Sequence, residues 1–156
     1  MTKQTVYRLP KKVDFTKLKP FREGLNLQLF SDICNKWIEE PRRLDMYEWL
    51  NIGREFENDW ESPPCNTVGC IEGWARFLSS KNNFVLNGFL ALGVAYGSDL
   101  AYPSGWPRKY STSYKDNWNN LVDARTNKNQ KQYLKIQKQL VAITIARIKH
   151  YILTGE

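Results

Sequence analysis

The segment from Pro63 to Ser79 constrains the fold of this 156-residue chain most, because it joins a helix stop to a helix that carries two glycines. Pro63 and the proline after it cannot continue a helix and hold the chain extended. Thr67 is a good N-cap residue, and apolar residues recur after it at helical spacing up to Leu78. The pattern predicts a helix over residues 68–79.

The two glycines of this expected helix, Gly69 and Gly73, are four residues apart and therefore share one face. Each costs roughly 1 kcal/mol relative to alanine inside a helix. We therefore expect another backbone to approach this face closely, with Trp74 supplying bulk beside the gap. The helix is the element against which we expect the neighbouring segments to pack.

Two cysteines flank the start of the same helix. Cys70 falls in the first turn, where the helix dipole favours a thiolate, and Cys65 lies just upstream. We expect the two sulfurs to pack near each other, and a disulfide between them is geometrically feasible, whereas a reducing compartment favours two thiols or a labile redox pair. Cys34 lies on the inward side of an upstream helix, where we expect a buried small hydrophobic residue.

Few further ligands accompany these cysteines. A structural zinc site takes about four Cys or His ligands, and the single histidine, His150, belongs to a distant helix. A Cys–His nucleophile would need His150 to reach Cys70, which nothing in the sequence requires. We therefore expect no metal, no cofactor and no catalytic residue. The candidate functional motif comprises Cys65, Thr67, Cys70, Gly73 and Trp74.

Acidic and aromatic residues alternate over residues 55–61. Period two places the four carboxylates on one side of an extended segment, an arrangement suited to a hard cation such as calcium or magnesium. No glycine shapes a loop there, and the spacing does not match an EF-hand. We favour ordinary surface carboxylates that face basic segments of the chain.

The spacing of apolar residues along the whole chain predicts an all-α fold. One compact helical domain of about six helices is expected over residues 24–156, with an extended basic arm over residues 1–23 packed on it. Trp106 lies between glycine and proline, and we expect it to close the edge of the core rather than to stack on a ligand. Helices are expected over 25–39, 43–52, 68–79, 84–92, from after Ser113 to about Thr126 and over 128–153, with one helical turn over 98–102.

The net charge of +7 is concentrated at the two ends of the chain. Residues 1–23 carry seven Lys and Arg against two carboxylates, residues 125–156 carry seven against one, and the middle carries nine against thirteen. Two interpretations are open. In the first, the basic ends lie over the acidic middle or are simply solvated; in the second, they form an anion-binding surface. The candidate anion-contacting residues are Lys131, Lys135 and Lys138, spaced along one face of the last helix.

Nothing in the sequence indicates a membrane protein. The first residues are polar and basic, without the apolar stretch of a signal peptide. The longest nearly apolar stretch, residues 84–96, is too short to span a bilayer. We expect a cytoplasmic protein without a membrane partner.

The pattern Cys-x-Thr-x-x-Cys-Ile-x-Gly-Trp-Ala resembles a motif of a family of small, uncharacterised bacterial and phage proteins. The similarity extends to Leu44-Asp45-Met46 and Trp49 before the motif, and to Ala91-Leu92-Gly93, Leu100-Ala101-Tyr102-Pro103 and Trp106-Pro107 after it. The chain departs from the pattern at Asn66, where glycine is usual, and at Glu72, where a small residue is usual. The family has no assigned function, so the resemblance implies a fold and no chemistry.

Two functions from different classes therefore remain. The first is a non-enzymatic binding or interaction module whose basic ends contact an acidic protein or a nucleic acid. The alternative is a thiol-dependent enzyme or redox sensor that uses Cys70 together with Cys65. The sequence favours the first function and identifies neither a ligand nor an oligomeric state.

Overall fold

The fold is all-α, as expected, with five α-helices in the described part of the chain against about six expected. The computed structural model describes residues 5–47, 50–51, 58–61, 63, 68–79, 87–95 and 98–156. The helices are α1 (Leu27–Glu39), α2 (Ile71–Ser79), α3 (Gly88–Leu92), α4 (Arg108–Thr126) and α5 (Gln130–Thr154). The described ranges hold one two-stranded sheet, in which β1 (Leu50–Asn51) pairs antiparallel with β2 (Val68–Gly69).

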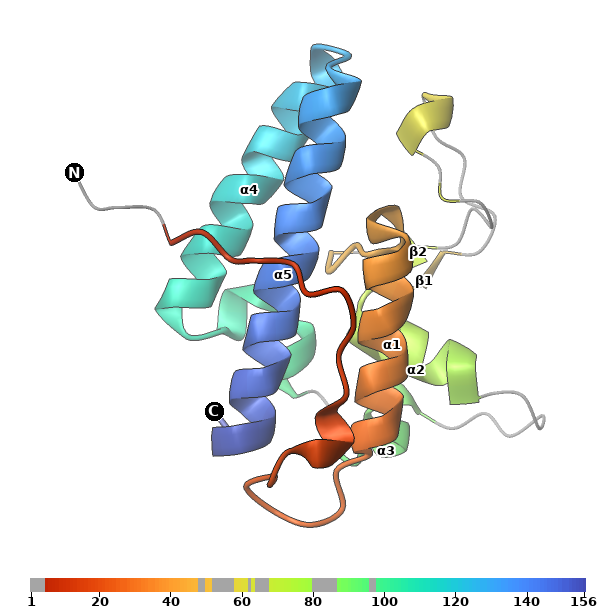
Figure 1. Cartoon of the computed structure of the whole chain (residues 1–156), viewed down its shortest axis with the longest axis vertical. Coiled ribbons are helices and arrows are strands. Elements are labelled where there is room, and N and C mark those ends of the chain that lie inside the picture. Colours follow the sequence, from red (N-terminus) through yellow and green to blue (C-terminus); the bar gives the residue numbers. More distant parts are fainter. Residues whose placement is uncertain are drawn as a thin grey trace.

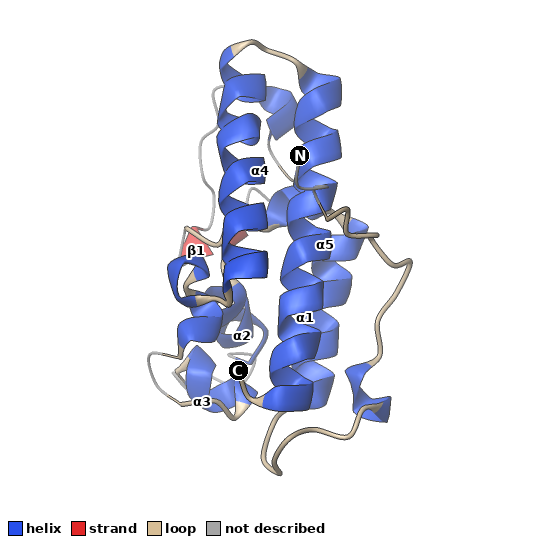
Figure 2. Cartoon of the chain, turned by 90° about the vertical axis from the view of Figure 1, so that its left-hand side faces the viewer, coloured by secondary structure: helices blue, strands red, loops and turns tan. Residues whose placement is uncertain are grey.

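Three long helices run side by side along the long axis of the molecule (Figure 1). The helix α5 packs against α4 and α1, and both of these run antiparallel to it. Figure 2 shows α4 and α5 as a long hairpin. The shorter helices α2 and α3 pack against each other and against α1. No helix in the described ranges is long and apolar enough to cross a membrane.

The helix α5 supplies much of the core. Its side chains at Leu140, Ile143 and Ile152 are completely buried, and its first turn is capped by Asn129, whose side-chain oxygen accepts a hydrogen bond from Gln132 N at 3.1 Å. It ends at Thr154, and Gly155 caps its C-terminus by donating its N–H to Tyr151 O at 2.7 Å. The expected helix over 128–153 is therefore confirmed to within two residues at either end.

The helix α4 begins earlier than expected. The serine and threonine residues at 111–113 were expected to precede the helix, but they lie inside it, and the helix begins at Arg108 directly after Pro107. The hydroxyl of Ser113 donates to Lys109 O at 2.8 Å, which satisfies it within the helix. The turn residues therefore do not serve as a cap, and the predicted start was wrong.

The helix α1 confirms the helix expected over 25–39. Asn26 caps it by accepting from Leu29 N at 3.0 Å. Phe30, Ile33 and Trp37 on one face are completely buried. Cys34 is buried on the same helix, as expected for a small hydrophobic residue.

The prediction of a helix over 43–52 is wrong for the described residues of this segment. A 3-10 turn over Pro41–Arg43 is followed by Leu44, which forms a bridge with Gly69, and then by β1. The cause lies far along the chain: the buried side-chain amide of Gln137 donates to Pro41 O at 2.9 Å and to Leu44 O at 2.8 Å. Because a side chain of α5 supplies hydrogen-bond donors to these two carbonyl groups, they do not depend on helical hydrogen bonds to be satisfied.

The shorter elements follow the expected pattern in part. The helix α3 begins at Gly88 after the cap residue Asn87 and ends at Leu92, before the cap residue Gly93, which has a φ of +76°; residues 80–86 lie outside the described ranges. The expected turn over 98–102 is a 3-10 turn over Asp99–Ala101. Trp106 is buried, and its ring nitrogen donates to Leu100 O at 3.0 Å, as expected for a residue that closes the edge of the core.

The N-terminal arm crosses the front of α5 and reaches α1 (Figure 1). The side chain of Asn35 on α1 both accepts from Val13 N and donates to Val13 O, each at 2.9 Å. Phe15 is buried, and its N–H donates to the hydroxyl of Ser31 at 2.8 Å. Side chains of α1 thus replace a strand partner for the extended arm.

The acidic segment is described only from residue 58 onwards. Asp59–Glu61 form a 3-10 turn instead of the expected extended segment, and residues 52–57 lie outside the described ranges. Glu61 is buried, and its Oε1 lies 2.6 Å from Arg125 Nε on α4. Asn58 donates to the other carboxylate oxygen from both its backbone and its side chain. Glu61 is therefore a structural anchor.

Candidate functional site

The candidate motif is only partly a helix. Cys65 and Thr67 lie outside the described residues, and residues 68–69 form β2 rather than the start of the expected helix. Gly69 therefore does not share a helix face with Gly73, because it pairs with β1 and its carbonyl accepts from Asp45 N at 3.1 Å. The helix α2 begins at Ile71, with Cys70 immediately before it.

Trp74 fastens α2 to the segment that follows α1. Its ring is buried, and its Nε1 donates to Arg43 O at 3.0 Å. Phe77, one turn along, meets the ring edge to face with centroids 5.5 Å apart. Gly73 is also buried, on the same helix. Packing contacts alone therefore account for a tryptophan at position 74 of the motif.

Burial, not the helix dipole, decides the state of Cys70. Its side chain is 5% exposed, and burial raises the pKa of the thiol. Hydrogen bonds from the backbone amides of Glu72 and Gly73 lower the pKa, but by less. The thiolate expected at this helix start is therefore disfavoured. Burial likewise raises the pKa of Cys34 far above its usual range.

A close backbone approach in this region is made at Gly88, the first residue of α3. A Cβ at Gly88 would lie 2.1 Å from the carbonyl oxygen of Glu72, so no other residue fits there without moving α3. The same approach lets Gly88 N donate to Glu72 Oε1 at 3.0 Å. Glu72 is 6% exposed, and its Oε2 is buried without a hydrogen-bond partner among the described residues.

Cys70 and Glu72 both open onto a hollow of about 310 Å³. Sequence reasoning missed Glu72, although it is the one charged residue in the run Cys70–Ala75. Tyr47 and Tyr102 stand at the hollow, and each is about half exposed, at 53% and 51%. The described residues that line the hollow are Met46, Tyr47, Cys70, Glu72, Phe89, Ala101, Tyr102, Pro103 and Ser104.

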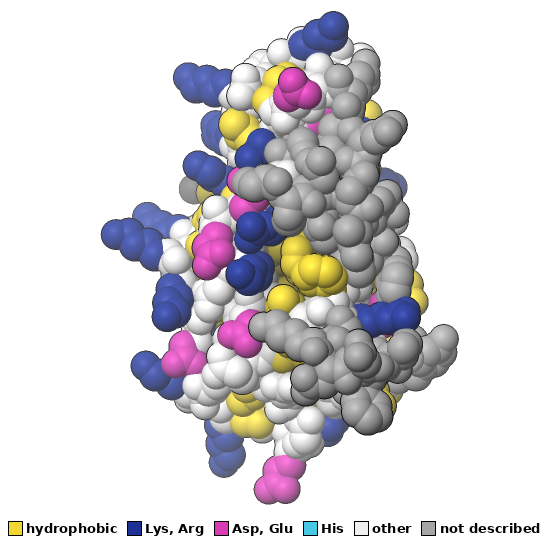
Figure 3. Space-filling view, turned by 90° about the vertical axis from the view of Figure 1, so that its right-hand side faces the viewer, with side chains coloured by type: hydrophobic (Ala, Val, Ile, Leu, Met, Phe, Trp, Pro, Cys, Tyr) yellow, Lys and Arg dark blue, Asp and Glu magenta, His cyan; other side chains and the backbone are white. Residues whose placement is uncertain are grey.

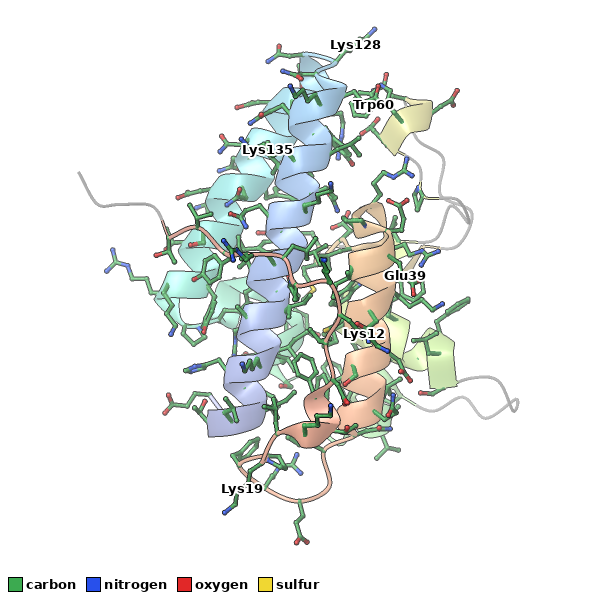
Figure 4. All side chains as sticks on the ribbon, in the orientation of Figure 1. Lys12, Lys19, Glu39, Trp60, Lys128 and Lys135 are labelled. Atoms are coloured by element: carbon green, nitrogen blue, oxygen red, sulfur yellow. The ribbon has the colours of Figure 1, made fainter. Side chains whose placement is uncertain are left out.

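The three candidate lysines do not line this hollow, and all three are exposed on α5. Lys135 and Lys138 line a groove of about 520 Å³ between the arm and the hairpin, whereas Lys131 is not part of its lining. Figure 4 shows Lys135 on α5 and Lys12 on the arm, on the side that faces the viewer. The groove is also lined by Val6, Tyr7, Leu9, Asn117, Asn120, Gln132, Ile136 and Gln139.

A second groove, of about 450 Å³, lies between the arm and α5. Arg8, Lys12 and Lys149 contribute positive charge to it, and Asp14 contributes the one carboxylate among the described lining residues. Tyr7 lines both grooves, and the side-chain amide of Gln139 holds the arm by donating to Tyr7 O at 2.6 Å. The two grooves and the arm between them are called the arm face below.

Basic side chains gather toward the arm face. In Figure 3 most of the Lys and Arg side chains project along the left edge, which is the side of the molecule that carries the arm in Figure 1. A few carboxylates lie among them. Within the described chain, neither Lys135 nor Lys138 forms an ion pair. Their charge is therefore available to an anion.

His150 has a separate environment. Its ring packs on Tyr110 with centroids 5.6 Å apart, and burial, followed by the charges of Lys109 and Arg147, lowers its pKa. It does not line the hollow beside Cys70. In the described ranges no three His, Cys, Asp or Glu side chains are placed to share a metal ion.

Comparison with known proteins gave no match to a family model, to a curated protein or to a solved structure. The resemblance of the motif to uncharacterised bacterial and phage proteins therefore stays a prediction. The function has to be argued from the residues themselves.

Proposed function

We propose that the protein is a non-enzymatic binding module that binds single-stranded nucleic acid on the arm face. The observation that carries this proposal is the pair Lys135 and Lys138, exposed on a groove and without a carboxylate partner in the part of the chain that the structure describes. Exposed lysine ammonium groups are the groups with which proteins contact phosphates.

The groove also offers groups that suit bases. Four side-chain amides, from Asn117, Asn120, Gln132 and Gln139, line it beside the lysines. Such amides both donate and accept hydrogen bonds, as base edges do. Tyr7 lies half-buried where the two grooves meet and supplies a ring on which a base can stack. An acidic protein segment would be recognised by the lysines alone, whereas nucleic acid also offers bases to the ring and the amides. We therefore favour nucleic acid.

The path of the arm gives the surface its length. Lys135 and Lys138 lie in one groove, while Arg8, Lys12 and Lys149 lie in the other. A strand that passes from one groove to the other over Tyr7 would meet positive charge throughout. Release of counterions from its phosphates would then drive binding.

The thiol alternative has less support. A nucleophilic or redox-active cysteine is usually exposed and has a lowered pKa. Cys70 is buried, and its pKa is raised. The position of Cys65 lies outside the described residues, so the pairing of the two sulfurs stays a prediction.

Fluorescence anisotropy with a labelled oligothymidylate tests the proposal. Binding should weaken steeply with salt, and the double variant Lys135→Gln, Lys138→Gln should reduce the slope of log K against log salt by about 1.4, since each contact to a single strand contributes about 0.7. The matched control is Lys19→Gln, Lys36→Gln, which removes the same charge from two exposed residues that line neither groove; Lys19 lies at the opposite end of the molecule (Figure 4). This control should bind like the native protein.

Two results would overturn the proposal. The first is no binding to oligothymidylate or to the matching RNA even at low salt. The second is equal loss of affinity in both double variants, which would mean that charge alone, and not the groove, attracts the polymer. Binding to polyglutamate but not to the oligonucleotide would move the protein to the class of acidic-protein binders.

A further inference from the structure

The hollow beside the motif helix, on which the proposed function does not depend, has the composition of a small-molecule pocket. Its volume of about 310 Å³ is at the lower end of the range of about 300–1,000 Å³ for ligand pockets. Its walls are mostly apolar or aromatic, from Met46, Phe89 and Pro103 together with the rings of Tyr47 and Tyr102. Glu72 is the one residue with a carboxylate among the described lining residues.

The carboxylate of Glu72 is held in place but only half satisfied. Oε1 accepts from Gly88 N at 3.0 Å, and Oε2 is buried and has no hydrogen-bond partner in the part of the chain that the structure describes. A carboxylate oxygen that is removed from water and left without a donor is costly, so such groups are either protonated or paired. Burial raises the pKa of Glu72, while Arg76 on the same helix lowers it by less. The free oxygen thus requires a donor that the described chain does not supply.

The rim of the pocket favours a cation over a neutral donor. The described residues that line it include no Lys, Arg or His. Tyr47 and Tyr102 present rings that are about half exposed, at 53% and 51%. Aromatic faces next to a carboxylate attract an organic cation, by cation–π contact and by charge.

We propose that this pocket binds a small organic cation with an apolar or aromatic body, whose ammonium or amidinium group pairs with Oε2 of Glu72. The body fills the space between Met46, Phe89 and the two tyrosine rings. The Gly88 contact fixes the carboxylate before the ligand arrives, so little side-chain freedom is lost on binding. Binding at this site is independent of the arm face.

Three probes of one shape test the charge requirement: benzamidine, benzamide and benzoate. We expect benzamidine to bind saturably in an NMR titration, with the largest shifts at the amides of 70–75 and of Phe89. Benzamide should bind at least tenfold more weakly, and benzoate should not bind. Equal binding of benzoate, or shifts spread evenly over the protein, would overturn the proposal.

The variant Glu72→Gln keeps the acceptor for Gly88 and removes the charge. This variant should weaken the binding of benzamidine at least tenfold. The control Glu39→Gln, on the exposed face of α1 (Figure 4), should change the affinity for benzamidine less than twofold. If Glu72→Gln fails to fold, Tyr102→Ala, at an exposed ring, should weaken binding severalfold. If the Glu72→Gln protein folds and binds benzamidine with unchanged affinity, the proposal is overturned. If Tyr102→Ala has to be used in its place, an unchanged affinity in that variant overturns the proposal.

The pH dependence gives an independent readout. Benzamidine stays protonated over the useful range, so its affinity should rise as Glu72 ionises and should level off above the raised pKa of that carboxyl. The other titratable groups that face the site are Cys70, Tyr47 and Tyr102 in the pocket and Arg76 on α2. A flat profile between about pH 5 and pH 8 would contradict pairing with Glu72.

Discussion

The substitution Gly88→Ala tests the packing of α2 against α3 most sharply. The new Cβ would lie 2.1 Å from the carbonyl oxygen of Glu72 and 2.8 Å from its Oε1. Ordinary contacts of this kind need more than 3 Å, and the nearest atom is backbone, which cannot rotate away. The two helices therefore have to move apart by about 1 Å, well within the distance over which packing energy is lost.

The expected cost combines two effects. Overpacking of a well-filled contact costs about 1–3 kcal/mol. The hydrogen bond from Gly88 N to the Glu72 carboxylate, at 3.0 Å, lengthens or breaks, and a bond to a charged group is worth about 1.5–3 kcal/mol. Alanine recovers at most about 1 kcal/mol through its helix propensity. The free energy of unfolding should therefore fall by about 2–4 kcal/mol.

Equilibrium unfolding in urea, followed by tryptophan fluorescence and by circular dichroism, measures this change. The matched control is Leu90→Ala on the same helix, where the side chain is 66% exposed. The control should change the free energy of unfolding by less than about 0.5 kcal/mol. A Gly88→Ala protein as stable as the native one would refute the close approach of α3 to Glu72.

Three further predictions concern buried groups. Arg125→Met strands the buried carboxylate of Glu61 and should lower the free energy of unfolding by about 3 kcal/mol, measured in urea. Cys34, buried and with its pKa raised, should resist iodoacetamide in the folded protein and react once urea unfolds it, as mass spectrometry will show. Because the pKa of Glu72 is raised on folding, its contribution to stability is complete below about pH 4.5 and is lost as pH rises through the raised value. Glu72→Gln should therefore raise the free energy of unfolding at about pH 8 more than at about pH 5; the reverse order would contradict the burial argument.

The long helices were predictable because their own sequences specify them. On α1, Phe30, Ile33 and Trp37 recur at helical spacing, and every one is completely buried. On α5 a similar buried stripe continues to Ile152. Local pattern and tertiary burial agree in both helices, so periodicity was a sufficient guide.

The segment after α1 was not predictable from local pattern. Its apolar residues recur at helical spacing, yet Gln137, more than ninety residues away in the sequence, binds two of its carbonyl groups. A side chain that reaches across the fold can replace helical hydrogen bonds, and no window of local sequence contains it. The error at residues 68–69 has the same origin, because β2 exists only through its pairing with β1.

The candidate site was predictable in position more than in chemistry. The exposure of Lys135 and Lys138 follows from their spacing on α5, but the groove beside them depends on the path of the arm, which long-range contacts such as that of Gln139 with Tyr7 fix. The burial of Cys70 depends on its neighbours in space. Glu72 was passed over, although a single carboxylate within an apolar motif is itself a signal of a specific partner.

Photo-cross-linking of the native protein to an oligothymidylate that carries 5-iodouracil tests the central claim most directly. Iodouracil reacts with aromatic rings that it stacks on, and mass spectrometry then locates the adduct. Binding on the arm face predicts adducts on Tyr7 and its neighbours in residues 5–12, lost at high salt and in the Lys135→Gln, Lys138→Gln protein. Adducts confined to Tyr47 or Tyr102, on the pocket by α2, would contradict it.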